Sequence, residues 1–246
     1  MTQWATDAWR TLVPPPHDRH GPLAPILVAL TVVTGLVDAF SYLVLGHVFV
    51  ANMTGNVVFL AFALVGAPGF SVLASVVALA AFSVGALTGG RLSVVARHRG
   101  HMVVLVGTLQ ALLVAVAVVV DSVAHTPGRG PLRYALIAVL SLSMGAQNAM
   151  ARKLAVPDLT TTVLTLTITG ISADSRLAGG GGSKAGRRLV SALSMSLGAL
   201  VGALLVLKTS HPWITIVIAL VILGSVVVIT KVLSQGEPQW VHSPSP

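Results

Sequence analysis

The sequence contains eight runs of apolar residues separated by short polar connections. A hydrocarbon core about 30 Å thick needs about 20 apolar residues for each helical crossing, so the runs predict an all-helical, polytopic integral membrane protein. Two of them, the second and the sixth, are short and begin with polar residues. The runs extend approximately over 23–45, 50–66, 71–90, 102–120, 134–150, 159–171, 189–207 and 213–233.

The distribution of positive charge indicates how many runs cross the membrane, because Lys and Arg favour cytoplasmic loops. If all eight runs cross, nine of the 15 Lys and Arg residues lie inside and six lie outside. If the second and sixth runs enter and leave on one side, twelve lie inside and three lie outside. We therefore predict six full transmembrane helices plus two short re-entrant or broken, polar-tipped helices, with both termini in the cytoplasm.

Three short motifs occur twice in the same order, which indicates an internal repeat. Each half would contain three crossings, and an odd number means that the second half is inverted relative to the first. Inverted repeats with discontinuous helices are typical of secondary transporters. The pairs are Gly35-Leu-Val-Asp-Ala39 with Gly145-Ala-Gln-Asn-Ala149, Asn52-Met-Thr54 with Asp158-Leu-Thr160, and Ser83-Val-Gly-Ala-Leu-Thr-Gly89 with Ser196-Leu-Gly-Ala-Leu-Val-Gly202.

The repeat divides the chain into five parts. We expect a polar cytoplasmic tail at 1–22, which reads as irregular, the first membrane repeat at 23–120 and a loop at 121–133. The second membrane repeat then covers 134–233, and a second cytoplasmic tail covers 234–246.

Composition narrows the functional classes further. Of the 246 residues, 54% are hydrophobic and 9% are charged, which leaves no room for a soluble catalytic domain. The absence of cysteine excludes disulfides and thiolate metal sites. The net charge of +8 is accounted for by basic cytoplasmic loops, so we expect no nucleic-acid partner.

Several strings resemble the signature segments of the YoaK-like family of bacterial membrane proteins. They are Gly35-Leu-Val-Asp-Ala-Phe-Ser-Tyr42, Val48-Phe-Val-Ala-Asn-Met-Thr-Gly-Asn56, Val156-Pro-Asp-Leu-Thr-Thr-Thr-Val-Leu164 and Gly170-Ile-Ser-Ala-Asp174. The resemblance covers roughly residues 25–233. It implies a polytopic protein of the bacterial inner membrane, and it implies no reaction, because the family is a domain of unknown function without an assigned substrate.

Asp38 is the charged side chain within the first run, about 22 Å along a helix from its start. A carboxylate inside a membrane is costly and is a functional hypothesis by default. One interpretation is an ion ligand or proton carrier. The other is a structural Asp38 near the outer interface that hydrogen-bonds the start of the next element. Its counterpart in the second repeat is Asn148, beside Gln147.

The starts of the two short runs carry residues that commonly cap helices. If these starts face each other across the repeat axis, their positive dipole ends would form a site that favours anions. Capping of the free N–H groups explains the same residues without any ligand. The residues are Asn52, Thr54 and Asn56 in the first repeat and Asp158, Thr160, Thr161 and Thr162 in the second.

Two pairs of glycines at four-residue spacing occupy equivalent positions of the repeats: Gly85 with Gly89, and Gly198 with Gly202. Such pairs allow close approach of helix backbones, so we expect packing within the chain rather than a dimer contact. We recognise no metal-binding or nucleotide-binding motif and no nucleophile motif. The sequence therefore predicts no cofactor, no metal site and no enzymatic activity.

These observations predict a transporter, or a channel-like carrier, of a small solute or ion through a polar site between the repeats. The alternative is a non-transporting membrane scaffold, or a component that binds a lipid or a partner protein. Beyond the lipid bilayer, a homo-oligomer is a possible assembly. We expect the location to be the bacterial inner membrane.

Overall fold

The computed structural model describes residues 3–15, 18–123, 130–157, 159, 169–170, 172–173, 178–179, 185–236 and 238–242, and regular structure in these residues is helical. The helices are α1 (Gln3–Leu12), α2 (Leu23–Val44), α3 (Met53–Leu64), α4 (Val72–Val95), α5 (Arg99–Val123), α6 (Pro131–Leu154), α8 (Ala185–Lys208), α9 (Ile214–Leu233) and α10 (Gln239–His242).

Six of these helices, α2, α4, α5, α6, α8 and α9, are long and apolar enough to cross a membrane. The apolar helix α3 has 12 residues, which corresponds to about 18 Å and is too short to span the hydrocarbon core. The prediction of six full crossings and a short second element is therefore confirmed. Most of the other predicted short element, 159–171, lies outside the described residues.

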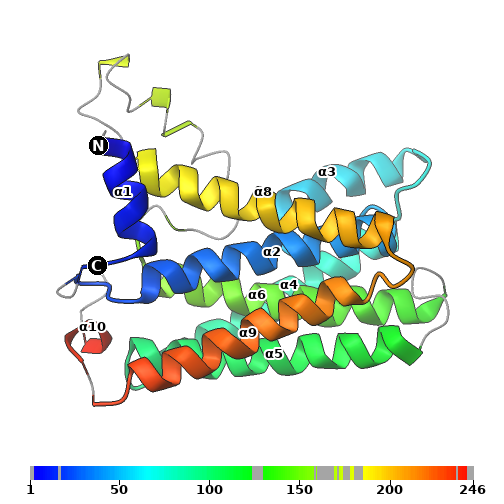
Figure 1. The fold of residues 1–246 in the computed structure, drawn as a ribbon. Coiled ribbons are helices and arrows are strands. Elements are labelled where there is room, and N and C mark those ends of the chain that lie inside the picture. Colours follow the sequence, from blue (N-terminus) through cyan, green and yellow to red (C-terminus); the bar gives the residue numbers. More distant parts are fainter. Residues whose placement is uncertain are drawn as a thin grey trace.

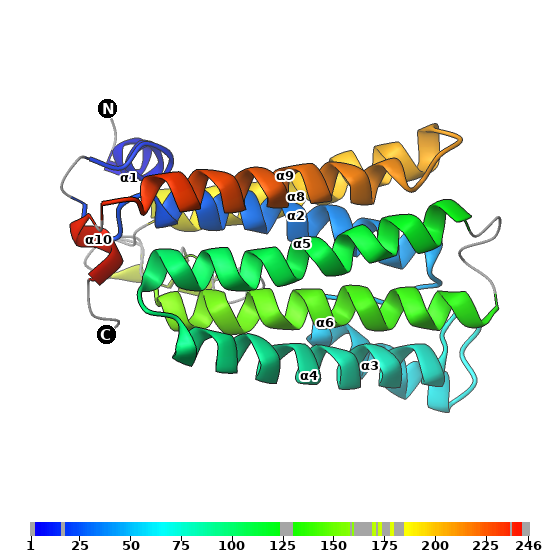
Figure 2. The ribbon, with the colours of Figure 1, turned by 90° about the horizontal axis from the view of Figure 1, so that it is seen from below.

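The six long helices form a bundle in which successive members run in opposite directions (Figures 1 and 2). The helices nearest the two termini, α1 and α10, lie at one end of this bundle. We call this the terminal end and the opposite one the far end. Helix α6 ends and α8 begins at the terminal end, so the connection 155–184 returns to the side on which it started.

The structure corrects the prediction for the first tail, and both tails contain a helix. The polar segment 1–22, expected to be irregular, contains α1, and the segment 234–246 contains α10. Trp240 and Val241 of α10 are buried. Neither helix has an apolar run of membrane length, since α1 has 10 residues and α10 has 4, so a search for such runs does not detect them.

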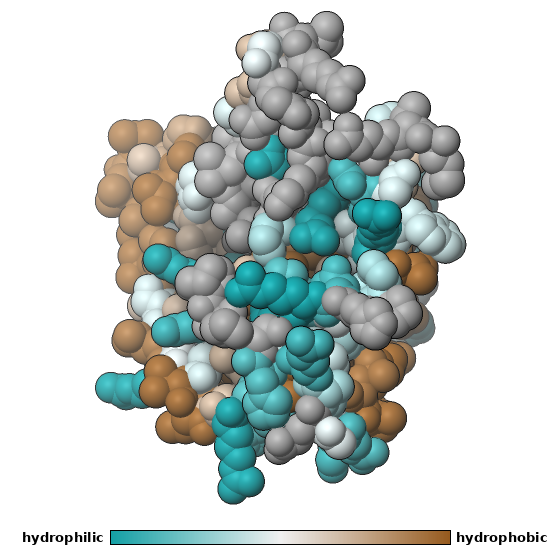
Figure 3. All heavy atoms as spheres, turned by 90° about the vertical axis from the view of Figure 1, so that its left-hand side faces the viewer, coloured by the Kyte–Doolittle hydropathy of each residue, from teal (hydrophilic) through white to brown (hydrophobic). Residues whose placement is uncertain are grey.

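Positive charge collects at the terminal end. Ten of the twelve described Lys and Arg residues lie there, and Figure 3 shows hydrophilic side chains over the middle of this face with apolar ones at its edges. The ten are Arg10, Arg19, Arg91, Arg97, Arg99, Arg152, Lys153, Arg187, Arg188 and Lys231, whereas Arg133 and Lys208 lie toward the far end.

Candidate functional site

Asp38 lies on α2 and holds the segment that leads into α3. Its side chain is 3% exposed. One carboxylate oxygen, Oδ1, accepts hydrogen bonds from the backbone N–H groups of Val50 at 3.0 Å and Ala51 at 2.9 Å. The other, Oδ2, accepts from Nδ2 of Asn52 at 2.9 Å. Because three donors converge on it, the carboxylate fixes the depth at which α3 begins.

These contacts correspond to the structural interpretation of Asp38, in which it bonds the start of the next element. They also differ in one respect from simple helix capping. Asn52 occupies the N-cap position of α3, but its side chain makes no capping bond to the helix. It donates to Asp38 instead, so a residue on another helix fixes the entrance to α3.

Asn56 completes the attachment from within α3. Its Oδ1 accepts from the backbone N–H of Phe49 at 2.9 Å, and its Nδ2 donates to the carbonyl of the same residue at 2.6 Å. The side chain is fully buried. Thr54, the third predicted residue of this start, is exposed on α3.

Aromatic side chains stabilise the rest of the segment between α2 and α4. Tyr42 of α2 stacks on Phe49, with ring centroids 5.0 Å apart. Phe59 of α3 lies 5.6 Å from Phe49 and 5.1 Å from Phe70, just before α4. Such ring pairs add about 0.5–1.5 kcal/mol each beyond their buried area, so the segment between α2 and α4 is a packed unit.

A second buried polar cluster lies between α2, α5 and α6. Gln147 of α6 accepts through Oε1 from Nε2 of Gln110 at 2.6 Å and donates through Nε2 to Oγ1 of Thr34 at 2.9 Å. All three side chains are fully buried. Oε1 of Gln110 has no hydrogen-bond partner within the described part of the chain.

Only Gln147 of this cluster was singled out from the sequence. Gln110 was missed, although an amide near the middle of the fourth apolar run was a usable signal, because such a group must find a protein partner inside a membrane. Thr34 carried no signal, since threonine is tolerated in a helix by bonding its own backbone. Here its hydroxyl donates to the Leu30 carbonyl at 3.0 Å and still accepts from Gln147.

The second predicted helix start lies mostly outside the described residues. Asp158, Thr160, Thr161 and Thr162 lie outside the described residues, so the expected proximity of Asn52 and Asp158 stays a prediction. Asn148 is described and half-buried, and its Nδ2 donates to the Met144 carbonyl at 2.9 Å.

The predicted glycine pairs lie at close contacts between helices of the same chain. A Cβ atom at Gly85 of α4 would meet the carbonyl of Leu142 on α6, and one at Gly89 would lie 2.6 Å from the Cα of Ala146. On α8, a Cβ atom at Gly198 would meet the carbonyl of Val32 on α2. These neighbours are backbone atoms, which cannot move aside as a flexible side chain can.

The same relation holds for the partner helices. A Cβ atom at Gly35 of α2 would meet the carbonyl of Met195 on α8, and one at Gly145 of α6 would meet the carbonyl of Phe82 on α4. Gly202 faces Leu36 on α2. The helices therefore form two tightly packed pairs, α2 with α8 and α4 with α6, while α5 lies along α9.

Arg99 joins three segments at the terminal end. Its Nη2 donates to the Leu154 carbonyl, at the end of α6, at 2.6 Å and lies 3.2 Å from Nδ1 of His20. Burial lowers the pKa of His20 from 6.5, and the guanidinium of Arg99 lowers it further. The neutral imidazole can then accept the Arg99 hydrogen bond.

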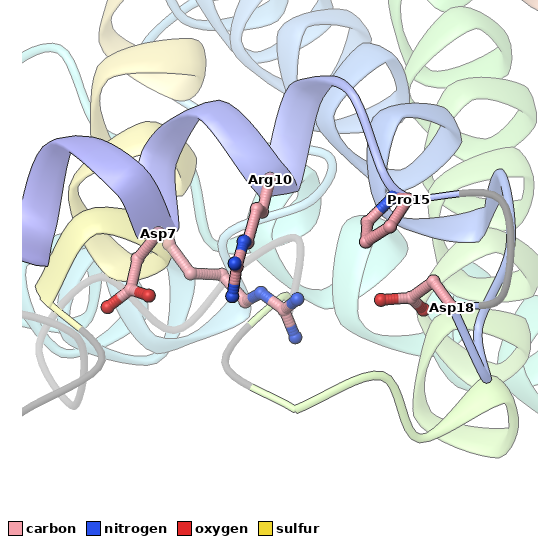
Figure 4. Close-up of a pocket in the computed structure, with 5 residues that line it drawn as sticks. Asp7, Arg10, Pro15 and Asp18 are labelled. Carbon is pink, nitrogen blue, oxygen red and sulfur yellow. The ribbon is translucent and has the colours of Figure 1, made fainter.

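A small polar pocket of about 260 Å³ also lies at the terminal end (Figure 4). Its lining combines two carboxylates, two guanidinium groups and a proline, from Asp7, Arg10, Pro15, Asp18 and Arg187. None of the five residues was predicted to bind a solute. Within the described residues, no three His, Asp or Glu side chains are placed to hold a metal ion.

The chain is similar to a known protein family. The chain matches a family described as "Protein of unknown function (DUF1275)" over residues 26–229, which is most of its length. The chain belongs to this family. The DUF1275 match begins within α2 and ends within α9, so it includes α3 and nearly all of the six long helices but excludes α1 and α10. This match and the similarity to a curated relative together confirm the resemblance to YoaK-like membrane proteins.

A curated relative carries the same resemblance by name. The chain is 33% identical over 149 residues to the UPF0700 transmembrane protein YoaK of Bacillus subtilis (strain 168). The match covers 61% of this chain and 65% of the relative, so it spans just under two thirds of the relative's length. No solved structure matches. Together with the six apolar helices, this similarity shows a multi-pass membrane protein.

Proposed function

We propose that the protein carries a small solute or ion across the bacterial inner membrane through a polar path between two inverted repeats. The observation that carries the proposal is the arrangement of the glycine contacts. The first repeat contains α2, α4 and α5, and their counterparts in the second repeat are α6, α8 and α9. If each helix is replaced by its counterpart, the packed pair α2–α8 becomes the packed pair α6–α4, and the pair α5–α9 stays the same. Corresponding helices run in opposite directions (Figure 1), as inverted repeats require.

The agreement extends to individual residues. Gly35 faces Met195, and its counterpart Gly145 faces Phe82. Met195 and Phe82 are themselves counterparts, because they are 113 positions apart, as Gly85 and Gly198 are. The contact of Gly85 with Leu142 and that of Gly198 with Val32 correspond in the same way. This second correspondence uses the offset of 110 between Gly35 and Gly145.

Two further features support a path rather than a rigid scaffold. Helix α3 starts within the depth of the bundle, as discontinuous helices of transporters do. The Thr34–Gln110–Gln147 cluster places uncharged donors and acceptors between three helices. Since the Asp38 carboxylate already has three donors, this uncharged cluster is the better candidate for contact with a polar solute.

The competing function is a non-transporting membrane component that binds a lipid or a partner protein. The burial of Asp38 and its bonds to backbone N–H groups favour it, because a group fully used in holding α3 has no capacity left for a solute. In this case the polar residues would serve only to cap and pack. Neither function involves catalysis.

The proposed orientation places the terminal end in the cytoplasm, since it carries most of the Lys and Arg residues. The chain lacks cysteine, so single cysteines report accessibility directly. Both Ser210, after α8, and Gln235, after α9, are exposed, at opposite ends. In intact cells, an impermeant thiol reagent should label Ser210→Cys and spare Gln235→Cys. Labelling of Gln235→Cys alone would reverse the orientation.

Flux measurements in proteoliposomes test the transport proposal. Candidate ions and small polar solutes are offered with and without a pH gradient, and at least one should enter faster than in protein-free liposomes. Gln147→Met should lower this flux, because it removes one acceptor and two donor hydrogens of the cluster. The control is Thr230→Val, since Thr230 is equally buried on α9 and bonds only its own helix. Equal flux in protein-containing and protein-free liposomes would support the scaffold.

A further inference from the structure

A groove of about 460 Å³ lies at the terminal end, where α5 begins and α9 ends. The two helices approach closely here, because a Cβ atom at Gly100 of α5 would lie 2.7 Å from the Cβ of Ser234. The lining is basic or imidazole-bearing, apart from one hydroxyl and one valine, and consists of Arg97, His98, His101, Val104, Lys231 and Ser234.

The hydrogen bonds of the two histidines determine what they present to a ligand. Nδ1 of His98 accepts from the backbone N–H of His101 at 3.1 Å, and Nδ1 of His101 accepts from the backbone N–H of Arg97 at 3.2 Å. A neutral imidazole has one donor and one acceptor nitrogen. Both rings therefore carry their proton on Nε2.

The groove thus combines a guanidinium, an ammonium group and the imidazole N–H of His101, and none of its described lining residues is a carboxylate. The Ser234 hydroxyl is already used, since it lies 2.8 Å from the Thr230 carbonyl. Such a donor-rich, positive lining matches an anion that has several acceptor oxygens. We propose that this groove binds a phosphate group, which a phospholipid headgroup or a soluble phosphate compound could supply.

The position of the groove brings it within reach of lipid. Val104 lies about 8 Å along α5 from the start of the helix at Arg99, so the lining passes from charged to apolar toward the membrane interior. Basic pockets between transmembrane helices at the positively charged side of a membrane bind anionic headgroups. The proposal is independent of transport, since a scaffold could use the same site.

Binding to the full chain in detergent tests the inference. Phosphatidylglycerol is titrated by native mass spectrometry, and inorganic phosphate is titrated by calorimetry. Lys231→Gln and Arg97→Gln should each weaken binding about fivefold, as expected for the loss of one charge near the surface. Both side chains are exposed, so neither change removes buried contacts. Arg152→Gln is the matched control, because Arg152 is also exposed at the terminal end but does not line the groove.

The outcomes separate the two sources. Lipid binding that inorganic phosphate does not displace assigns the groove to a headgroup. Binding of inorganic phosphate that displaces the lipid assigns it to soluble phosphate compounds. Failure of both probes to bind overturns the proposal, and so does an equal loss in Arg152→Gln, since that would indicate general attraction to a positive surface.

Discussion

Replacing Asp38 by alanine tests whether this carboxylate holds α3 in place. The substitution leaves three donors without their acceptor, and the two residues that contribute backbone donors, Val50 and Ala51, are buried. An unpaired buried donor costs about 1–2 kcal/mol, so Asp38→Ala should lower the free energy of unfolding by roughly 3–6 kcal/mol. Asp38→Asn should cost less, about 1–2 kcal/mol, because the remaining oxygen can accept both backbone bonds and Asn52 can rotate its amide.

The assay is unfolding in mixed detergent micelles, followed by circular dichroism. Thr31→Val on the same helix is the control: Thr31 is also 3% exposed, but its hydroxyl makes a single bond, to the Leu27 carbonyl of its own helix. This variant should lose about 1 kcal/mol or less. Hydrogen exchange gives a local readout, because the amides of Val50 and Ala51 should exchange faster in Asp38→Ala. Stability equal to that of Thr31→Val, with unchanged exchange at these amides, would refute the reasoning.

Three further predictions concern the repeats and the terminal end. The second repeat has Asn148 and Asp158 where the first has Asp38 and Asn52. The double variant Asp38→Asn/Asn52→Asp should therefore be more stable in a detergent melt than Asp38→Asn alone. A double variant that is less stable would contradict the equivalence of these positions. Gly85→Leu should lower the melting temperature strongly and Gly90→Leu should not, because a Cβ atom meets backbone at the first position and open space at the second. Equal melting temperatures of the two variants would contradict close packing at Gly85. Since burial and the neighbouring guanidinium lower the pKa of His20 from 6.5, the unfolded chain binds the proton more readily, and stability should fall as the pH drops below 6.5; a His20→Gln variant with the same pH dependence would exclude this cause.

The hydropathy pattern was sufficient to predict where the long helices lie in the chain, but it predicted their ends less well. The fourth run, 102–120, corresponds to α5, which extends over Arg99–Val123, and the fifth run, 134–150, corresponds to α6 at Pro131–Leu154. Both helices continue past the apolar run, because Arg and Lys side chains can reach the polar interface from helix ends. Arg152 and Lys153 of α6 are examples, and both are exposed.

The contacts of the candidate site could likewise be predicted only in part from the sequence. The pairing of Asp38 with the start of the next element could be anticipated, since an intramembrane carboxylate needs donors and an early helix start supplies them. The bond between Gln110 and Gln147 could not, because it joins residues 37 positions apart on two helices, and only the packing of α5 on α6 brings them together. The basic groove depends likewise on the approach of Gly100 to Ser234 across two distant segments.

The central claim, a polar path between the repeats through which a solute or ion crosses the membrane, can be tested without a known substrate. Thr34→Cys introduces a thiol into the fully buried polar cluster, and Thr230→Cys introduces one at an equally buried position of α9 as a control for general breathing. Each is exposed to a small, impermeant thiol reagent in right-side-out and in inside-out membrane vesicles. A transporter predicts reaction of Thr34→Cys from both sides and protection of Thr230→Cys. Protection of both thiols in both vesicle types would contradict a path and favour a static scaffold.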